Sequence, residues 1–344
     1  MTSVPQLFVG IDYHQDNVQV CVLDEDAHQI LNRSLDNDAD AICRAIGQRG
    51  RVAGVAIEAC CGAANLADEL LERTNWPLHL AHPGYVARLK QSPDKTDFSD
   101  ARLLADLERV GYVPKVWLAP EQIRQLRRLI RHRQQLVNSR RSVKLRLRAL
   151  LRENRIKAPL GCNAWTKAWL TWVADLDALS PDDRWLMDQH LAELQHATTQ
   201  IKAVEQRLAE RVKDDPVVEK LLAFQGVGFV TAVTLRAEIG YFDRFQTGKQ
   251  LSRFCGLSPR NASSGQRQAD AGLIKAGNPG LRTVLIELGH RLIRQQNSRW
   301  SKLGYQMMRR GKPRNVVVAA VANRWVRWLY HQMQSDQIFV QTSA

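Results

Sequence analysis

The sequence contains no long apolar run and few cysteines, and it has no internal repeat. No stretch approaches the roughly 18 uninterrupted apolar residues that a membrane-spanning helix needs, and the first residues lack the basic-then-apolar pattern of a secretory signal. The six cysteines form no CxxC pair and no Cys/His ligand spacing, which argues against a zinc site or a disulfide framework. We therefore expect a globular, cytoplasmic protein with no membrane partner and with reduced, mostly buried thiols.

Acidic residues become scarce after the first hundred positions. Residues 1–100 carry 8 Lys and Arg against 15 Asp and Glu, a net charge of −7, and the rest of the chain carries 41 against 20, a net charge of +21. A basic body of this size predicts a polyanionic partner, because each neutralised phosphate releases a counterion. Nucleic acid is the leading candidate, and a merely soluble basic surface is the alternative.

Residues 1–118 have the pattern of an α/β domain. Short apolar runs alternate with amphipathic stretches in the order β-β-β-α-β-α-β-α, which is the order of a ribonuclease-H-like (RuvC-like) domain. The first three strands are expected to form a meander with a turn at Asp24-Glu-Asp26. The expected strands lie at 7–12, 18–23, 28–35, 52–57 and 78–81, and the expected helices lie at 39–48, 63–73 and from about residue 98.

Residues 119–215 are expected to form a long helical segment. From Glu121 to about Ile156 there is neither Gly nor Pro, and apolar residues recur every seven positions. This seam predicts a coiled coil with a partner chain, or a helix that folds back on a second helix expected at 181–213. A tryptophan stripe follows the first helix, and such stripes more often pack in a core than stack on bases. The seam is Leu129, Leu136, Val143 and Leu150, and the stripe is Trp165, Trp169 and Trp172.

From residue 216 onwards, glycines separate short apolar segments, which predicts a mainly helical domain over 216–344. The expected fold class is therefore α/β plus all-α. Gly226-Val-Gly228 precedes an apolar helix expected at 230–239. A Gly-x-Gly turn at a helix start exposes backbone N–H groups that can bind a DNA phosphate, as in a helix-hairpin-helix element. The alternative is an ordinary turn between two helices.

Four acidic residues stand at the ends of the expected elements of the first domain. Asp12 ends the first strand, Glu58 ends the fourth, and Asp97 and Asp100 begin a helix. Strand ends converge at one edge of such a sheet, so the four carboxylates can meet there. The cluster is repulsive unless metal ions neutralise it, and oxygen ligands favour Mg²⁺ or Mn²⁺, which support phosphoryl transfer. Taken singly, the two helix acids are better explained as caps and Glu58 as a solvated strand end.

The long helix carries the most one-sided charge of the chain. Residues 124–157 hold 13 Lys and Arg and the single acid Glu153. A charge run is usually a solvated face, but one so uniform would repel itself without polyanions nearby. Arginine binds phosphate in a bidentate manner and stacks on bases, which suits structured RNA as well as DNA. The residues predicted to bind nucleic acid here are Arg124, Arg127, Arg128, Arg131, Arg140, Arg141, Lys144 and Arg148.

A loop of the last domain combines serine, glycine and cations. It runs from Leu257 to Ser264-Gly265 and is followed by the stretch from Lys275 to Arg282. A loop serine can act as a nucleophile where cationic groups hold a phosphate nearby. By composition alone the segment is only a turn. The candidate phosphate-binding residues around it are Arg260, Lys275 and Arg282, besides Gly226 and Gly228 of the earlier turn.

Together and in this order, these stretches resemble the insertion-sequence one-ten family of transposases, which have a DEDD site in a RuvC-like domain. The resemblance extends over nearly the whole chain. Its most specific parts are the Lys-Thr-Asp-x-x-Asp-Ala-Arg run and the Ser-Gly to Lys-Ala-Gly block, whereas Gly-Ile-Asp is common to several folds. The matching stretches are Gly10-Ile-Asp12, Ile57-Glu58-Ala59, Lys95-Thr-Asp97-Phe-Ser-Asp100-Ala-Arg102, Gln225-Gly-Val-Gly228, Gly256-Leu-Ser-Pro-Arg260, Ser264-Gly265 and Ile274-Lys-Ala-Gly-Asn278.

The resemblance implies roles for individual residues. It makes the metal ligands Asp12, Glu58, Asp97 and Asp100, and it makes Ser264 the nucleophile that links covalently to a DNA phosphate. Spacing from the Leu-Ser-Pro-Arg stretch favours Ser264 over its neighbour Ser263. Gln15 departs from the family, which often has Lys after the first Asp, and this puts a phosphate contact there in doubt.

The resemblance also implies partners. These are donor and target DNA, a structured guide (bridge) RNA whose loops pair with both, and further copies of the chain. The implied homo-oligomer is a dimer or tetramer whose active sites combine domains of different subunits, and strands exchange through a Holliday junction.

Two other functions fit the residues. One is a structure-specific, junction-resolvase-like DNA endonuclease that uses the four acids alone. The other is a non-catalytic DNA- or RNA-binding protein that keeps the fold. A sugar-kinase-like chain also begins with a strand and Gly-Ile-Asp, but the basic body and the lack of clear Gly-rich phosphate loops argue against it.

Overall fold

The computed structural model describes residues 5–47, 49–90, 96–261, 270–274 and 276–334. The chain divides into two compact units, Met1–Pro120 and Glu121–Ala344. The first boundary lies two residues beyond the one expected at 118. The regions expected to form separate domains at 119–215 and 216–344 lie together in the second unit.

The first unit is built on a mixed sheet with the strand order β3-β2-β1-β4-β5-β6. The meander β1-β2-β3 is antiparallel, β4 and β5 run parallel to β1, and the short β6 is antiparallel to β5. The predicted strands are all present, with ends shifted by no more than one residue. The strands are β1 (Gln6–Tyr13), β2 (Asn17–Leu23), β3 (Gln29–Asp36), β4 (Arg51–Glu58), β5 (Leu78–Ala81) and β6 (Lys115–Val116).

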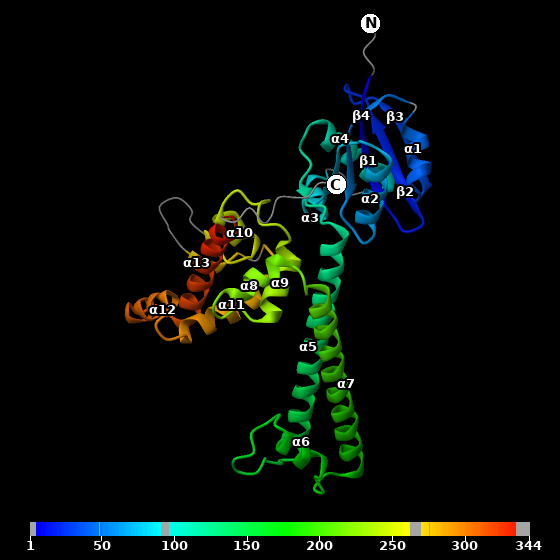
Figure 1. The fold of residues 1–344 in the computed structure, drawn as a ribbon. Coiled ribbons are helices and arrows are strands. Elements are labelled where there is room, and N and C mark those ends of the chain that lie inside the picture. The colour runs from blue at the N-terminus through cyan, green and yellow to red at the C-terminus, as the bar shows by residue number, and fades with distance from the viewer. Residues whose placement is uncertain (1–4, 48, 91–95, 262–269, 275, 335–344) are drawn as a thin grey trace. The chain divides into compact units, whose positions relative to one another are not determined.

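Different helices cover the two faces of this sheet (Figure 1). Leu7, Val9 and Ile11 alternate along β1 and pack in one core with α1 (Ala39–Gly47) and α2 (Ala63–Arg73). On the other face lie α3 (Pro83–Leu89) and α4 (Asp97–Arg109), in a core that includes Ala56 of β4.

A glycine allows α4 to approach the sheet closely. A Cβ atom added at Gly10 would lie 2.0 Å from the carbonyl oxygen of Ala101, so any side chain at this position of β1 would push α4 away. Since α4 begins with two of the predicted acidic residues, this close packing also fixes their distance from β1. The glycine of the Gly-Ile-Asp stretch therefore has a structural reason.

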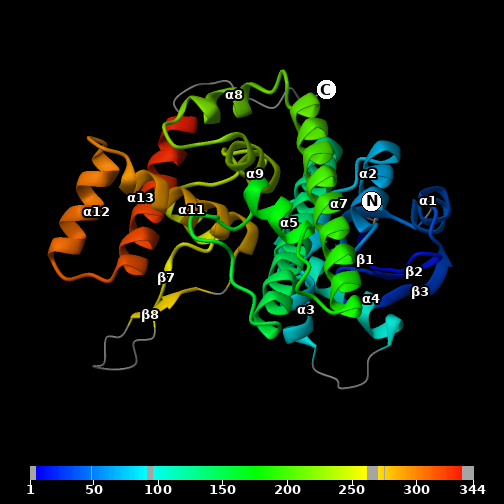
Figure 2. The same ribbon diagram turned by 90° about the horizontal axis from the view of Figure 1, so that it is seen from below.

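The second unit begins with two long helices that lie side by side, α5 (Glu121–Glu153) and α7 (Pro181–Arg211) (Figures 1 and 2). Of the two arrangements open from the sequence, the structure shows the helix folded back within one chain. Near the connection Val143 and Leu147 are buried against Met187 and Leu194, together with the short α6 (Lys167–Ala174). Trp169 of α6 is 2% exposed, which confirms core packing for this tryptophan.

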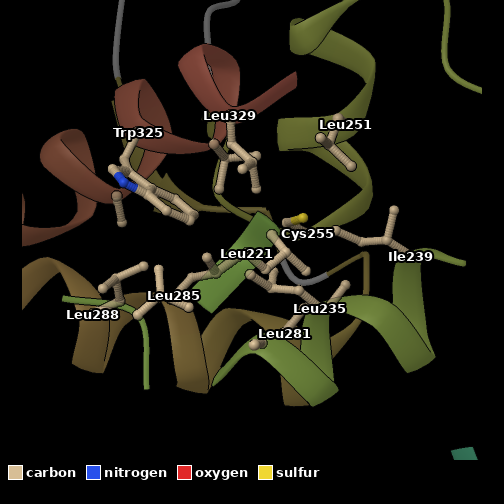
Figure 3. Packing of buried hydrophobic residues seen from close by; sticks show 14 of the residues in the cluster. Leu221, Leu235, Ile239, Leu251, Cys255, Leu281, Leu285, Leu288, Trp325 and Leu329 are labelled. Carbon is tan, nitrogen blue, oxygen red and sulfur yellow. The ribbon is translucent and has the colours of Figure 1, made fainter. Parts of the chain in front are cut away.

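The remaining elements form a mainly helical body, as predicted. Figure 3 shows its core, in which leucines from α8, α9, α10, α11 and α13 surround Cys255 and Trp325. Leu126 and Leu208, from the near ends of α5 and α7, belong to the same core, which explains why the two expected domains are one unit. The elements are α8 (Pro216–Ala223), α9 (Phe229–Ile239), α10 (Gly248–Phe254), β7 (Pro259–Asn261), β8 (Asp270–Leu273), α11 (Pro279–Arg294), α12 (Arg299–Arg309) and α13 (Arg314–Gln334).

Two smaller expectations concern membranes and cysteines. No helix among the described residues is both long and apolar enough to cross a membrane. All six cysteines are free, but only Cys21 and Cys255 are buried, while Cys60 and Cys61 are exposed. The expectation of mostly buried thiols was therefore wrong.

Candidate functional site

The register of the sheet brings the first two acidic residues together. Parallel pairing joins Ile11 of β1 to Ile57 of β4, so Asp12 and Glu58, the next residue on each strand, lie at the same end of neighbouring strands. Asp12 is largely covered, with 13% of its side chain exposed. The predicted convergence of these two carboxylates is thus a consequence of β1–β4 pairing.

The first turn of α4 supplies the other two acidic residues. Thr96 caps this helix by accepting a hydrogen bond from the backbone N–H of Ser99 at 3.2 Å, which fixes where the helix starts. Asp97 follows the cap and is 59% exposed, whereas Asp100 is buried with a 4% exposed fraction. The buried Asp100 carboxylate accepts a hydrogen bond from the Lys90 ammonium at 2.6 Å.

A histidine that the sequence reasoning missed lies between two of the acids. His14 Nε2 is 3.4 Å from Asp12 Oδ2 and 3.4 Å from Asp97 Oδ2. One ligand atom from each of these three residues lies within 4.8 Å of the others, a spacing that suits a metal ion. The signal was present in the sequence, because a residue two positions after Asp12 on an extended chain points to the same side.

The pKa of Asp12 responds to the other three carboxylates. Burial raises the pKa of Asp12 above its ordinary value, and the charges of Asp100, Glu58 and Asp97 raise it further, while His14 opposes the shift. These three carboxylates are therefore close enough to act on Asp12 at this edge of the sheet. That all four acids bind one metal stays a prediction.

The donor chemistry fits a hard divalent cation. Four carboxylates and an imidazole are ligands that Mg²⁺ and Mn²⁺ accept, and the nearest thiol does not compete. That thiol is Cys60, whose pKa is raised by desolvation and by the charges of Glu58 and Asp12, so it stays protonated. Lys90 holds one oxygen of the buried Asp100 carboxylate through its hydrogen bond.

The cations predicted on the N-terminal half of α5 (Arg124 to Arg131, the near half) are engaged within the chain. Arg124 and Arg128 both pair with Glu121, at 2.7 and 2.6 Å. Arg127 donates hydrogen bonds to the carbonyl oxygens of Ala237 and Glu238, at 2.7 and 3.2 Å.

Arg131 is tied still more firmly to α9. It holds the buried Glu238 carboxylate through two bonds of 2.9 Å. Together with Arg127 it thus joins α5 to α9, a structural role that the sequence did not indicate.

The cations predicted on the C-terminal half of α5 (Arg140 to Arg148, the far half) are at least partly exposed to solvent. Arg141 and Arg148 are exposed, and Arg140 and Lys144 are partly exposed. Lys144 Nζ and Arg148 Cζ lie 4.6 and 5.2 Å from the ring centroid of Trp165, close enough for cation–π contacts. Of the eight predicted residues on this helix, these four remain the candidates for contact with a nucleic acid.

The predicted phosphate-binding role of Arg282 stays a prediction, and its guanidinium also has partners within the chain. Its Nε donates to the Gly256 carbonyl at 2.9 Å and its Nη2 to the Ile274 carbonyl at 3.1 Å, so the guanidinium links the segments on either side of the β7–β8 pair. A Cβ atom added at Gly256 would lie 2.4 Å from Arg282 Nη2, which explains the glycine there. Arg282 is a brace for this strand pair. Arg260, on β7, is exposed.

The Gly226-Val-Gly228 turn connects α8 to α9, as predicted. Gly226 has a φ of 86°, which favours glycine, and Gly228 is the N-cap residue of α9 and has no side-chain cap. The first N–H groups of α9 thus lack a side-chain partner at the cap position, which is compatible with the predicted phosphate contact. Ser263, Ser264 and Lys275 lie outside the described residues.

Comparisons with known proteins find two family models along the chain, the first of which extends across the boundary at Pro120. Residues 9–155 match a family model described as "Transposase", the DEDD domain of IS110 elements, and residues 218–306 match "Transposase IS116/IS110/IS902 family". Among similar curated proteins, "Transposase for insertion sequence element IS1111A" of Coxiella burnetii is 26% identical, over 93% of this chain and 88% of its own length. "Probable family 20 transposase" of Pseudomonas aeruginosa is 29% identical, over 96% and 98%.

The chain combines acidic residues at the edge of a mixed sheet with a basic helical unit, and a transposase model matches part of each. These findings define the class of this protein as an insertion-sequence transposase. Within that class, the chain belongs to the IS110 family. The resemblance found in the sequence is confirmed at this level.

Proposed function

We propose that this transposase cleaves and rejoins DNA in a metal-dependent reaction centred on Asp12, Glu58, Asp97 and Asp100. The observation that carries the proposal is the proximity of these four acids at one edge of the sheet, where burial and the charges of the other three acids raise the pKa of Asp12. The strand order and the helix on each face of the sheet support a ribonuclease-H-like assignment for residues 1–118.

The residues divide the work of holding Mg²⁺ or Mn²⁺. Asp12 and Glu58 present carboxylates from neighbouring strand ends, Asp97 adds an exposed one from α4, and Lys90 keeps the Asp100 carboxylate oriented. His14 lies between Asp12 and Asp97, where its imidazole can share a ligand position or hold a proton. When bound, the metal activates the attacking oxygen and stabilises the departing one in phosphoryl transfer.

A cleavage assay with a substitution at Glu58 tests the metal site. Strand cleavage of a substrate carrying the ends of the insertion sequence should require Mg²⁺ or Mn²⁺ and should be lost in Glu58→Gln. Glu69→Gln changes an acid on α2, outside the cluster, in the same way and should retain activity. Equal activity of the two variants would exclude Glu58 from the reaction.

We further propose Ser264 as the nucleophile of strand exchange, because the loop that contains it resembles the family's serine block. Its hydroxyl oxygen would bond to a DNA phosphorus as the phosphodiester bond to the leaving nucleoside oxygen breaks. The serine proton passes to that leaving oxygen, and reversal with a second strand's hydroxyl frees the serine. Four-way (Holliday) junctions would form as the two duplexes exchange strands, with sites shared between subunits of a dimer or tetramer.

The second candidate function is a DNA endonuclease that uses the acids alone. It is favoured by the fact that all four acids of the cluster lie within residues 1–120. Trapping on a denaturing gel separates the two functions. A covalent protein–DNA adduct that disappears in Ser264→Ala, but not in Ser263→Ala, supports the serine mechanism, whereas unchanged cleavage in Ser264→Ala supports the endonuclease.

We also propose a structured guide RNA as a partner, bound in part by the far half of α5. The support is the group Arg140, Arg141, Lys144 and Arg148, of which two members lie against Trp165. Sequencing the RNA that copurifies with the chain should recover one transcript from beside its gene. A random sample of cellular RNA would contradict a dedicated guide.

A further inference from the structure

A large cavity opens in the helical body of the second unit, beside the β7–β8 pair. It has a volume of about 1130 Å³ and is enclosed by α10, the β7–β8 pair, α11 and α13. Figure 2 shows β7 and β8 beside α11 and α13. The volume is above the roughly 300–1,000 Å³ that is typical of small-molecule sites, which favours part of a polymer as the occupant.

The charged residues that line the cavity all have one sign. They are Lys249 of α10 and Arg314, Arg324 and Arg327 of α13, and none of the described lining residues is acidic. All four are exposed, and in the part of the chain that the structure describes none of them forms an ion pair with a carboxylate. This contrasts with Arg124, Arg128 and Arg131 on α5, which do.

Part of the cavity lining is apolar. Leu273 of β8, Ile286 of α11 and Val316 of α13 line it, as does His290. An apolar surface open to water is unfavourable unless a partner covers it. Apolar side chains and a histidine ring are surfaces against which an unpaired base can pack.

The cavity is held open by specific contacts. Asn323 of α13 donates hydrogen bonds from Nδ2 to Ser252 Oγ at 2.7 Å and to the Leu257 carbonyl at 3.1 Å, which fixes α13 to α10 and to the segment before β7. Gly248 lets α10 approach α13, because an added Cβ would lie 2.9 Å from the carbonyl oxygen of Arg327. The walls are therefore positioned by the fold.

We propose that this cavity binds one strand of the DNA substrate, with an unpaired base against its apolar residues and phosphates on its four cations. A protein helix could also cover an apolar groove, but it would need an acidic face to match four cations. A duplex keeps its bases stacked inside, so only an unpaired base can reach Ile286. The proposal rests on the DNA-processing function above, but it requires neither the metal nor the serine.

The position of the cavity gives the bound strand a purpose. Pro259 and Leu273, which line the cavity, belong to β7 and β8, and the proposed nucleophile Ser264 lies between these strands in the sequence. Arg282 braces the segments on both sides of this pair. A strand held here would be anchored beside the element from which the serine loop begins.

Binding of the full-length chain to a fluorescein-labelled oligothymidine, in EDTA, tests the proposal. Ile286→Trp places a bulky ring among the apolar residues of the cavity, and Arg324→Ala with Arg327→Ala removes two of its cations. Each should weaken binding at least tenfold, and the double variant should also reduce the salt dependence, by about 0.7 in log–log slope per lost phosphate contact. The matched control, Arg211→Ala with Lys213→Ala, removes two exposed cations outside the cavity and should bind within twofold of the unsubstituted chain.

Several results would overturn the proposal. One is unchanged affinity for oligothymidine in a folded Ile286→Trp variant. Another is an equal loss of affinity in the control variant. A third is that the cavity variants lose more affinity for oligouridine RNA than for oligothymidine DNA. If Ile286→Trp changes the oligomeric state and leaves DNA binding unchanged, the occupant is a second copy of the chain and the proposal is wrong. Should Ile286→Trp fail to fold, photocrosslinking of the unsubstituted chain to 5-iodouracil DNA decides, since the adduct must fall on peptides that line the cavity.

The test is independent of the metal-site proposal. Asp12→Asn should keep its affinity for oligothymidine in EDTA while losing cleavage. If the cavity variants bind oligothymidine as tightly as the unsubstituted chain, and cleavage still depends on the metal, only the cavity proposal is rejected. Cleavage that survives Asp12→Asn would reject only the metal site.

Discussion

The two units concentrate charge by different means. In the first, the fold gathers acids that are up to 88 positions apart in the sequence, Asp12 to Asp100, at one edge of the sheet, where they repel one another. In the second, cations lie close in sequence along α5, but the fold separates them into a near half tied to α9 and Glu121 and a far half that stays exposed. Like charges that the fold brings close together indicate a binding site. A high density of like charges along the sequence does not by itself do so.

The largest expected effect concerns the acidic cluster. Asp12→Asn should lower the rate of metal-dependent DNA cleavage by about 1,000-fold, since the loss of a central ligand removes several kcal/mol of transition-state stabilisation. Asp26→Asn is the matched control, because Asp26 is an exposed acid in the turn after β2, at the opposite end of the sheet. Comparable losses in both variants, measured as single-turnover rates, would show that the acids matter only through net charge.

The second effect separates the two halves of α5 by stability. Arg131→Ala should lower the free energy of unfolding by about 3 kcal/mol, because it leaves the buried Glu238 carboxylate without its cation. Arg146→Ala, on the far half, should cost no more than about 1 kcal/mol, since its partner Glu193 is half exposed. Urea unfolding measures both, and equal costs would contradict the assignment of the near half to the fold.

The third effect separates the same halves by binding. Replacing Arg140, Arg141, Lys144 and Arg148 together by Ala should weaken RNA binding by about 10- to 100-fold at moderate salt, with a shallower salt dependence. Replacing Arg124 and Arg128, which pair with Glu121, should change the affinity much less. Filter binding over a range of salt concentrations tests this, and a greater loss in the near-half variant would reverse the comparison.

The smallest effect is a dependence of stability on pH. Because the pKa of Asp12 is raised in the folded state, the folded chain binds more protons than the unfolded chain between the two pKa values. Stability in EDTA should therefore fall as the pH rises through this window, and Asp12→Asn should remove that part of the dependence and unfold at a slightly higher temperature. A metal-free stability that rises with pH in the same window, and equally in Asp12→Asn, would contradict the repulsion within the cluster.

Much of the first unit could be predicted because its pattern is local. Short apolar runs mark β1, β2 and β4, and in β1 and β2 the alternation of apolar residues also decides which face of the sheet each side chain occupies. Parallel pairing then places Asp12 beside Glu58 without further information. The short elements α3, β6, β7 and β8 were missed, since two to seven residues carry too little pattern to separate a strand or helix from a loop.

What could not be predicted depends on partners distant in sequence. Glu238, which engages Arg131, is 107 positions away, and Gly256, which accepts a hydrogen bond from Arg282, is 26 positions away. An arginine that braces the fold therefore has the same local sequence as one that binds phosphate. His14 could have been predicted, because it lies only two positions after Asp12, but it is not part of the pattern of four acids.

The central claim is that the edge of the sheet in residues 1–120 is a divalent-metal site. Isothermal titration of Mn²⁺ into the full-length chain tests it without any requirement for DNA or activity. The account predicts saturable binding that is lost in Asp12→Asn and in Glu58→Gln and is retained in Asp26→Asn. Equal Mn²⁺ binding by all four proteins, or none by the unsubstituted chain, would contradict it.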